Sequence, residues 1–313
     1  MLFSCKSQFV FTYRFIIVHY RMGVKYFFVD VAGNCVVYLL KCFYGIYEGV
    51  FFMAFDGITI AAMVQELHRN LDGGRFNKIA QPEADELLIT GKGANGQCRL
   101  LLSASASLPL IYFTSKNKPS PMTAPNFCML LRKHIGSARI SDIRQPGLER
   151  VVEFELEHLN ELGDPCKKVL IMELMGKHSN IIFCDDKNMI LDSIKHVSSH
   201  MSSVREVLPG REYFIPQTQD KLDPLTVDEE TFIEVVCKKP CNISKAIYSS
   251  LTGISPVVAE EVCFRASVDG SDAAQALDEA AQVHLYHTFC RLMDQVREGD
   301  FTPNIIYRGE EPV

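Results

Sequence analysis

Residues 152–157 alternate strictly between apolar and acidic side chains, in the order Val-Glu-Phe-Glu-Leu-Glu. Successive side chains of a β-strand point to opposite faces, so this pattern is typical of a strand that buries one face and exposes the other. An isolated strand or hairpin is only marginally stable in water. The segment therefore predicts a sheet of several strands with one packed face.

Other short segments between residues 53 and 224 have the patterns of strands or helices. Residues 60–71 repeat apolar side chains on one helical face and end at Asp72-Gly73-Gly74. Residues 127–135 repeat the helical pattern, and a turn is expected at residues 185–188. Mixed strands and helices of this kind predict an α+β fold. The strand candidates are residues 86–90, 99–103, 111–114, 168–174, 180–183 and 189–194.

After Pro224 the strand pattern gives way to helical segments, expected at residues 227–236, 243–251, 257–266 and 272–298. We therefore expect a strand-rich domain over residues 53–224 and a helical module over residues 225–313. The sequence from Leu251 to Pro256 resembles a helix-hairpin-helix connection, which offers backbone amides to a phosphate. Ser255 stands where nucleic-acid-binding hairpins commonly carry a second glycine, so a purely structural turn is an equal alternative.

Net charge and cysteine usage exclude several classes of protein. The formal net charge is −6, and residues 53–313 carry 27 basic against 36 acidic residues. Tight binding to a polyanion needs a local excess of cations, so any RNA contact must be a basic patch on an acidic body.

The eleven cysteines contain no Cys-x2-Cys pair and predict reduced apolar side chains rather than disulfides. No metal site and no cofactor are expected, because no carboxylate or further cysteine completes His284-x2-His287-x2-Cys290.

The segment Pro125–Ile135 carries a basic pair on an amphipathic helix. Phe127, Leu131 and His134 recur at helical spacing and are expected to face a core together with Leu130. Arg132 and Lys133 then project from the opposite side, where solvent or a phosphate can reach them. A solvated charged face is the ordinary explanation of such a pair.

The amino-acid sequence of this helix resembles a signature of the NFACT family. Three further stretches resemble other motifs of that family and follow the order in which the family carries them. They are residues 53–57 with the following Gly73-Gly74-Arg75, residues 173–182, and residues 208–213. The resemblance covers residues 53 to about 225. It implies a first domain and helical module similar in architecture to formamidopyrimidine-type DNA glycosylases. Their N-terminal proline nucleophile has no counterpart in Met53-Ala54, so glycosylase chemistry is not implied.

The resemblance also implies a tRNA-binding site. The family's Asp-Arg pair matches Glu149-Arg150, with the acid one methylene longer, and its early acidic residue matches Asp56, which is also a good helix cap. Taken alone, Glu149 and Arg150 would be an ordinary surface ion pair. Within the shared motifs Arg132, Lys133, Lys177 and His178 are the remaining expected tRNA contacts. No catalytic residue is expected, and the chain is not expected to be an enzyme.

The implied function is that of a cytoplasmic ribosome quality-control factor. Such a factor binds the obstructed large ribosomal subunit with its peptidyl-tRNA and recruits alanyl-tRNA, so that alanine tails are added to stalled chains. The alternative is a surface adhesin that binds fibronectin. Family members continue into a coiled coil and a second globular domain, named NFACT-R, and we expect both to be absent from this chain.

Residues 1–52 differ from the rest in being dense in Phe, Tyr, Val and Ile. The longest charge-free run in their second half, residues 31–40, has half the length that a membrane-spanning helix needs. Since the family resemblance starts at Met53, we expect residues 1–52 to be a non-native upstream extension. An accessory segment or a weak membrane-surface element is the alternative.

Overall fold

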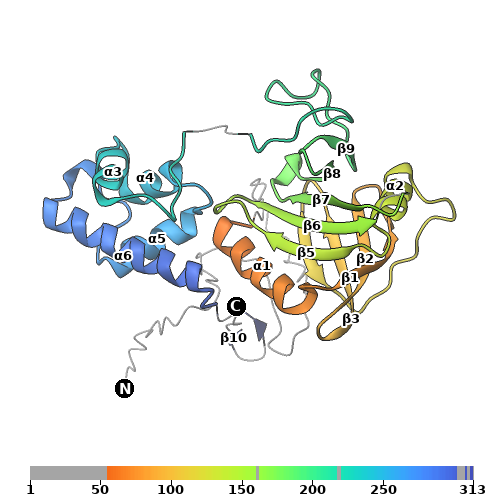
Figure 1. The fold of residues 1–313 in the computed structure, drawn as a ribbon. Coiled ribbons are helices and arrows are strands. Elements are labelled where there is room, and N and C mark those ends of the chain that lie inside the picture. The colour runs from red at the N-terminus through yellow and green to blue at the C-terminus, as the bar shows by residue number, and fades with distance from the viewer. Residues whose placement is uncertain (1–54, 160–161, 217–219, 302–306, 309–310, 313) are drawn as a thin grey trace.

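The structure is a computed structural model that describes residues 55–159, 162–216, 220–301, 307–308 and 311–312. The expected upstream extension, residues 1–52, lies outside the described residues. Figure 1 shows two parts, which we name the strand-rich unit (residues 55–216) and the helical unit (residues 220–301). No helix in the described part of the chain is long and apolar enough to cross a membrane.

The strand-rich unit is built on nine antiparallel strands in the order β4-β3-β2-β1-β5-β6-β7-β8-β9. This confirms the strand-rich α+β class and every strand that the sequence predicted. The strands are β1 (Arg75–Ala80), β2 (Glu86–Gly93), β3 (Gly96–Ser103), β4 (Leu110–Phe113), β5 (Arg139–Arg144), β6 (Val151–Leu159), β7 (Pro165–Glu173), β8 (Asn180–Asp185) and β9 (Ile190–Ser193).

Strands β1 and β5 are absent from the sequence prediction, and both contain a β-bulge. The register of β1 shifts between Phe76 and Lys78, and that of β5 shifts between Ile140 and Asp142. A bulge inserts one extra residue into a strand, so every side chain after it points to the opposite face of the sheet. The alternation of apolar and polar residues is therefore interrupted within these strands. Their side-chain patterns therefore carry no strand signal.

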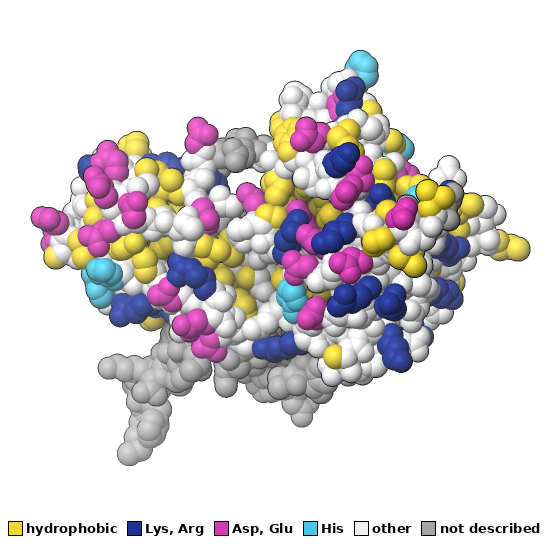
Figure 2. Space-filling model, in the orientation of Figure 1, with side chains coloured by type: hydrophobic (Ala, Val, Ile, Leu, Met, Phe, Trp, Pro, Cys, Tyr) yellow, Lys and Arg dark blue, Asp and Glu magenta, His cyan; other side chains and the backbone are white. Residues whose placement is uncertain are grey.

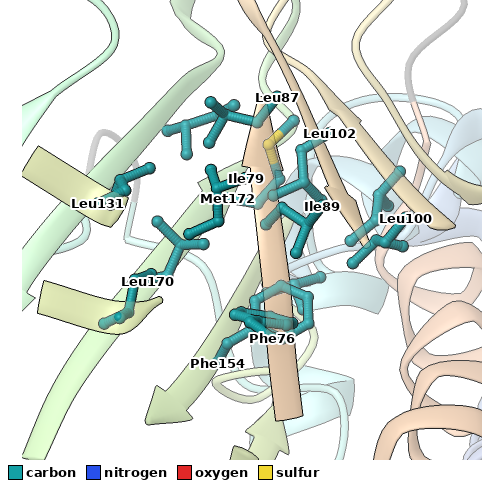
Figure 3. Close-up of a cluster of buried hydrophobic side chains, with 14 of the residues drawn as sticks. Phe76, Ile79, Leu87, Ile89, Leu100, Leu102, Leu131, Phe154, Leu170 and Met172 are labelled. Atoms are coloured by element: carbon teal, nitrogen blue, oxygen red, sulfur yellow. The ribbon is translucent and has the colours of Figure 1, made fainter. Parts of the chain in front are cut away.

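The sheet folds on itself where β1 meets β5, since those two strands pair only at Arg75 and Arg139. Its two halves then face each other across one apolar core. The ring centres of Phe76 from β1 and Phe154 from β6 lie 6.1 Å apart. Figure 3 shows both side chains within this core. The apolar face of residues 152–157 is buried as predicted, because Val152, Phe154 and Leu156 are all fully buried. The acidic face is less exposed than predicted, since Glu153 is nearly buried.

Two helices accompany the sheet. Helix α1 (Gly57–Leu71) buries Ile60, Leu67 and Leu71 in the sheet core, while its Ile58 and Ala61 pack against the helical unit. One helix thus supplies side chains to both cores, and Figure 1 shows α1 between the sheet and the helical unit. Helix α2 (Asn126–Ile135) matches the predicted range and covers β1 and β6.

The helical unit has its own core, and its last helix starts later than predicted. Residues 272–274 instead pair with the start of α4: the Ile243 amide donates to the Asp272 carbonyl and the Ala274 amide to the Cys241 carbonyl. The Asp278 side chain then caps the new helix. The elements are α3 (Glu229–Phe232), η2 (Ile233–Cys237), α4 (Ile243–Ser250), α5 (Pro256–Arg265), η3 (Ala274–Ala276) and α6 (Glu279–Glu298), followed by β10 (Tyr307–Arg308) and β11 (Glu311–Pro312).

Candidate nucleic-acid interface

The connection from β5 to β6 carries Glu149 and Arg150 to the junction between the two units. The Glu149 amide donates to the Pro146 carbonyl at 3.0 Å, and Gly147 has a φ of 55°, which favours glycine. Leu148 is buried among the side chains of the helical unit rather than those of the sheet. Because Leu148 anchors the turn there, its two neighbours lie beside the helical unit.

Arg150 is half-buried, whereas its place after a Pro-Gly turn predicts an exposed edge. Burial lowers the pKa of its guanidinium, and the negative charges of Glu149 and Asp56 oppose that effect. None of the described residues accepts a hydrogen bond from the guanidinium, although a buried arginine ordinarily has partners. The donors of Arg150 are therefore available to an incoming acceptor.

Glu149 is also half-buried, and burial raises the pKa of its carboxyl group. The charges of Arg150 and Lys221 act in the opposite direction. Within the described chain Glu149 and Arg150 form no ion pair with each other, so the ordinary surface ion pair is not what this structure contains.

Asp56 has both carboxylate oxygens occupied. Its Oδ1 accepts hydrogen bonds from the Thr59 amide and hydroxyl, both at 2.8 Å, and so caps α1. Its Oδ2 accepts a hydrogen bond from the Ser255 hydroxyl at 2.7 Å. Asp56 therefore ties the start of α1 to the turn between α4 and α5.

The turn from Leu251 to Pro256 packs against the strand-rich unit. The Gly57 amide donates to the Gly253 carbonyl at 2.7 Å, and a Cβ on Gly253 would lie 2.0 Å from the Leu148 carbonyl oxygen. Gly253 also has a φ of 70°, so both its backbone conformation and this close contact require glycine. These contacts give the turn a structural role, and its part in binding phosphate remains a prediction.

Lys177 and His178 lie exposed in η1 (Gly176–His178), the link between β7 and β8. This link adjoins Arg150, because the Leu174 amide donates to the Arg150 carbonyl at 2.9 Å. Three of the expected contact residues, Arg150, Lys177 and His178, thus lie at the same edge of the sheet.

Arg132 and Lys133 do not join that group. Both are exposed on α2 as predicted, but Nε of Arg132 donates to the Ile79 carbonyl at 2.7 Å. On the same helix the His134 ring lies 6.5 Å from the His158 ring, near the end of β6 opposite Arg150. Eight residues of strand separate His158 from Arg150, which is about 26 Å.

Sequence reasoning missed Lys221 and Lys239. Lys221 Nζ donates to the Tyr248 carbonyl at 2.9 Å, and Lys239 Nζ donates to the Ser250 hydroxyl at 2.8 Å. Burial lowers the pKa of Lys221, and the nearby positive charges of Arg150 and Lys239 lower it further. We name Asp56, Glu149, Arg150, Lys221 and Lys239 the junction cluster. Figure 2 shows the molecular surface hollowed between the two units.

Sequence reasoning also missed a buried ion pair beneath η1. Glu173 has no exposed surface, and the Arg205 guanidinium donates to its two oxygens at 2.5 and 2.6 Å. The Tyr213 hydroxyl donates to Glu173 at 3.0 Å, and the Arg205 guanidinium lies 5.3 Å from the centre of the Tyr213 ring. This network holds the segment after β9 against the sheet and supports the link that carries Lys177 and His178.

In the described residues, no three His, Cys, Asp or Glu side chains gather so that they could hold a metal ion. His287 instead lies 3.6 Å from the Glu229 carboxylate. The eight cysteines of the described chain are free. Burial raises the pKa of Cys184 and Cys263 to about 12.

The structure is thus a folded antiparallel sheet docked to a helical unit, with the junction cluster between the two. Residues 56–313 match the family described as the NFACT N-terminal and middle domains. The chain belongs to the NFACT family.

Curated relatives share this region. The Rqc2 homolog RqcH of Bacillus subtilis is 38% identical over 81% of this chain and 43% of its own length. That of Streptococcus suis is 34% identical over 74% of this chain and 42% of its own length. The mouse ribosome quality control complex subunit NEMF is 25% identical over 69% of this chain and 19% of its own length. The chain thus spans about two fifths of the length of the bacterial relatives.

Among solved structures, the N-terminal part of the fibronectin/fibrinogen-binding protein of Streptococcus suis aligns with a TM-score of 0.66 and 32% identity. The alignment covers 77% of this chain and 85% of that one. The fibrinogen-binding protein of Staphylococcus aureus aligns with a TM-score of 0.65 and 28% identity, over 78% of this chain and 83% of that one. The expected glycosylase-like architecture is outside what these likenesses support.

Proposed function

We propose that this chain is the tRNA-facing part of a cytoplasmic ribosome quality-control factor. The observation that carries the proposal is Arg150, which is half-buried at the junction of the two units with its guanidinium donors unused by the described chain. The names of the relatives support it, since the mouse relative is a ribosome quality control complex subunit. In this role the chain recruits alanyl-tRNA to an obstructed large ribosomal subunit that carries peptidyl-tRNA.

Arg150 is the central contact in this proposal. Its guanidinium can grip a phosphate bidentately or donate to a base edge, while Glu149 beside it can accept from a base amino group. Lys177 and His178 lie at the same sheet edge and contact the neighbouring RNA backbone. Asp56 acts indirectly, because both its oxygens are already bonded within the protein.

Arg132 and Lys133 form a second, separate contact. The neighbouring His134 packs against His158, which lies about 26 Å from Arg150 along β6. Arg132 and Lys133 therefore contact either a distant part of the tRNA or the RNA of the large subunit. The peptidyl-transfer chemistry belongs to the ribosome, so we propose a positioning and selecting factor that is not an enzyme and needs no cofactor.

The test is tRNA binding by Arg150→Ala. We expect the variant to fold as the unaltered protein does and to bind tRNA about 5- to 150-fold more weakly, if the guanidinium makes a bidentate base contact. Arg75→Ala is the matched control, because Arg75 is an exposed arginine of the same sheet whose guanidinium bonds only to the Ser137 carbonyl among the described residues. Equal tRNA affinity of the two variants would contradict the assignment of Arg150.

A second candidate function is fibronectin binding at the cell surface. The observation that favours it is the name of the solved Streptococcus suis relative, a fibronectin/fibrinogen-binding protein. The two functions are separated by fractionating cells and by passing the protein over immobilised fibronectin. A quality-control factor is expected to co-sediment with large ribosomal subunits, whereas an adhesin is expected on the cell surface.

A further inference from the structure

Two lysines that are distant in the sequence meet at the end of α4. Lys221 belongs to the segment that enters the helical unit, and Lys239 follows η2. The segment of Lys221 is fixed against the α4–α5 turn, because the Leu222 amide donates to the Ser250 carbonyl at 2.8 Å and the Thr252 amide to the Leu222 carbonyl at 3.0 Å. Each lysine makes one hydrogen bond there, to Tyr248 or to Ser250. An ammonium group has three donors, so both retain donors for a ligand.

The turn that follows α4 places these lysines near the β5–β6 connection. That turn packs on Leu148, two residues before Arg150, since a Cβ on Gly253 would lie 2.0 Å from the Leu148 carbonyl oxygen. The positive charges of Arg150 and Lys239 both act on Lys221. The carboxylates that face them are Glu149 and Asp56. Both oxygens of Asp56 are bonded to Thr59 and Ser255, which leaves Glu149 as the carboxylate that makes no side-chain hydrogen bond within the described chain.

A structural explanation of the lysines is incomplete. Cations near the C-terminal end of a helix stabilise its last carbonyls, and α4 ends at Ser250. One lysine suffices for that purpose, and helix capping gives no reason to place Arg150 beside the pair. Like charges held together in a partly buried position raise the free energy of the empty protein. A bound anion would remove that repulsion.

The arrangement fits a chain of phosphates better than a single ion. The cations extend from Lys177 through Arg150, whose carbonyl bonds the β7–β8 link, to Lys221 and Lys239 in the helical unit. A nucleic-acid backbone carries one phosphate per nucleotide, so cations on both units can each bind a different phosphate of one strand. Sequence-independent grip by lysines would complement the base or phosphate contact of Arg150.

We propose that Lys221 and Lys239 form, with Arg150, a phosphate-binding grip for the RNA backbone at the junction of the two units. This inference rests on the proposed function and adds two residues from outside the family motifs. In this role Lys221 and Lys239 increase the affinity for RNA but do not discriminate between RNA sequences.

The experiment measures tRNA affinity of the full chain over a series of salt concentrations for Lys221→Gln and Lys239→Gln. We expect each variant to bind all tRNAs more weakly and to reduce the slope of log affinity against log salt by about 0.7 to 0.9, which corresponds to one phosphate contact. Lys239→Arg keeps the charge and is expected to keep the slope. The control is Lys238→Gln, since Lys238 is the exposed neighbour that pairs with Glu234, and its slope is expected to match the unaltered protein.

The outcomes separate this inference from the proposed function. If the slopes of Lys221→Gln and Lys239→Gln equal that of Lys238→Gln while Arg150→Ala still weakens binding, the phosphate grip is wrong and the tRNA-binding role stands. If the unaltered protein does not bind tRNA at any salt concentration, both are wrong. Thermal melting of each variant checks the fold. Should a glutamine variant fail to fold, Lys→Met, which keeps the apolar stem and removes the same charge, replaces it in the measurement.

Discussion

The Ser255 hydroxyl donates a hydrogen bond to the Asp56 carboxylate at 2.7 Å, although the two residues are 199 positions apart in the sequence. The other oxygen of the same carboxylate caps α1 through the Thr59 amide. One side chain thereby fixes the start of a helix in one unit and the α4–α5 turn in the other. The family's early acidic residue has a structural task in this chain that is independent of any RNA.

Replacing Asp56 with Ala should therefore cost more than the loss of a helix cap. We expect about 1 kcal/mol from the cap and a further 1.5 to 3 kcal/mol from the hydrogen bond to a charged group. Asp278→Ala is the control, because Asp278 caps α6 through the Ala281 amide within a single unit. Urea unfolding measures both. Equal losses would mean that the contact with Ser255 contributes nothing to stability.

The buried pair of Glu173 and Arg205 gives a second prediction. Removing one partner of a buried pair leaves an uncompensated charge, so Arg205→Ala is expected to lower the free energy of unfolding by about 3 to 5 kcal/mol. Arg211→Ala removes an exposed arginine that pairs with Glu206, and it should change stability by no more than about 0.5 kcal/mol. Chemical denaturation compares the two. A small loss for Arg205→Ala would show that water or another cation replaces it.

Glu149 gives a prediction about pH. Burial raises the pKa of its carboxyl above the unfolded value, so the folded state is favoured by protonation and loses that stabilisation as pH rises through the folded pKa. Glu149→Gln removes this loss. The stability of the variant relative to the unaltered protein should thus increase from about pH 4 towards pH 7.

The measurement is a set of unfolding curves across that pH range, with Glu155→Gln on the acidic face of β6 as a comparison. Glu155 pairs with Arg144, so its replacement removes an attraction instead of a burial penalty. A relative stability of Glu149→Gln that falls with rising pH would show that attraction by Arg150 and Lys221 outweighs the burial of Glu149.

Leu148 gives a prediction about the docking of the two units. It lies in the strand-rich part of the sequence but is 2% exposed within the core of the helical unit. Leu148→Ala should lower the free energy of unfolding by about 2 to 5 kcal/mol through lost burial and the cavity left behind. It should also weaken tRNA binding, because Arg150 is held by the same turn. Leu159→Ala is the control, since Leu159 is 68% exposed.

The sequence predicts those features of the fold that follow from local pattern. The alternation along β6 is one of them. The pattern does not predict, however, that Glu153 on its acidic face is nearly buried and accepts a hydrogen bond from Nε of Arg144 on β5 at 2.6 Å. Strands β1 and β5 escape prediction because their bulges break the alternation. Local pattern determines facing only while the register is regular.

The candidate site was predictable only where a family motif marks it. Arg150, Lys177 and His178 come from such motifs and lie at one sheet edge, whereas Arg132 and Lys133 come from another motif and lie elsewhere. Lys221 and Lys239 stand in stretches without pattern, and the influence of Arg150 on Lys221 arises from how the two units dock. Tertiary placement of this kind leaves no trace in the spacing of residues along the chain.

Helix α1 contributes Ile60 and Leu67 to the sheet core and Ile58 and Ala61 to the helical core, and Gln65 on the same helix donates to the carbonyl of Gly299 at the end of α6. A boundary at residue 224 therefore separates two stretches of sequence whose folded units share the helix α1. Cutting the backbone between the units should yield a nicked, non-covalently associated pair rather than two separate pieces. Either unit, if expressed alone or fused to another protein, would expose an apolar surface that the other unit now covers.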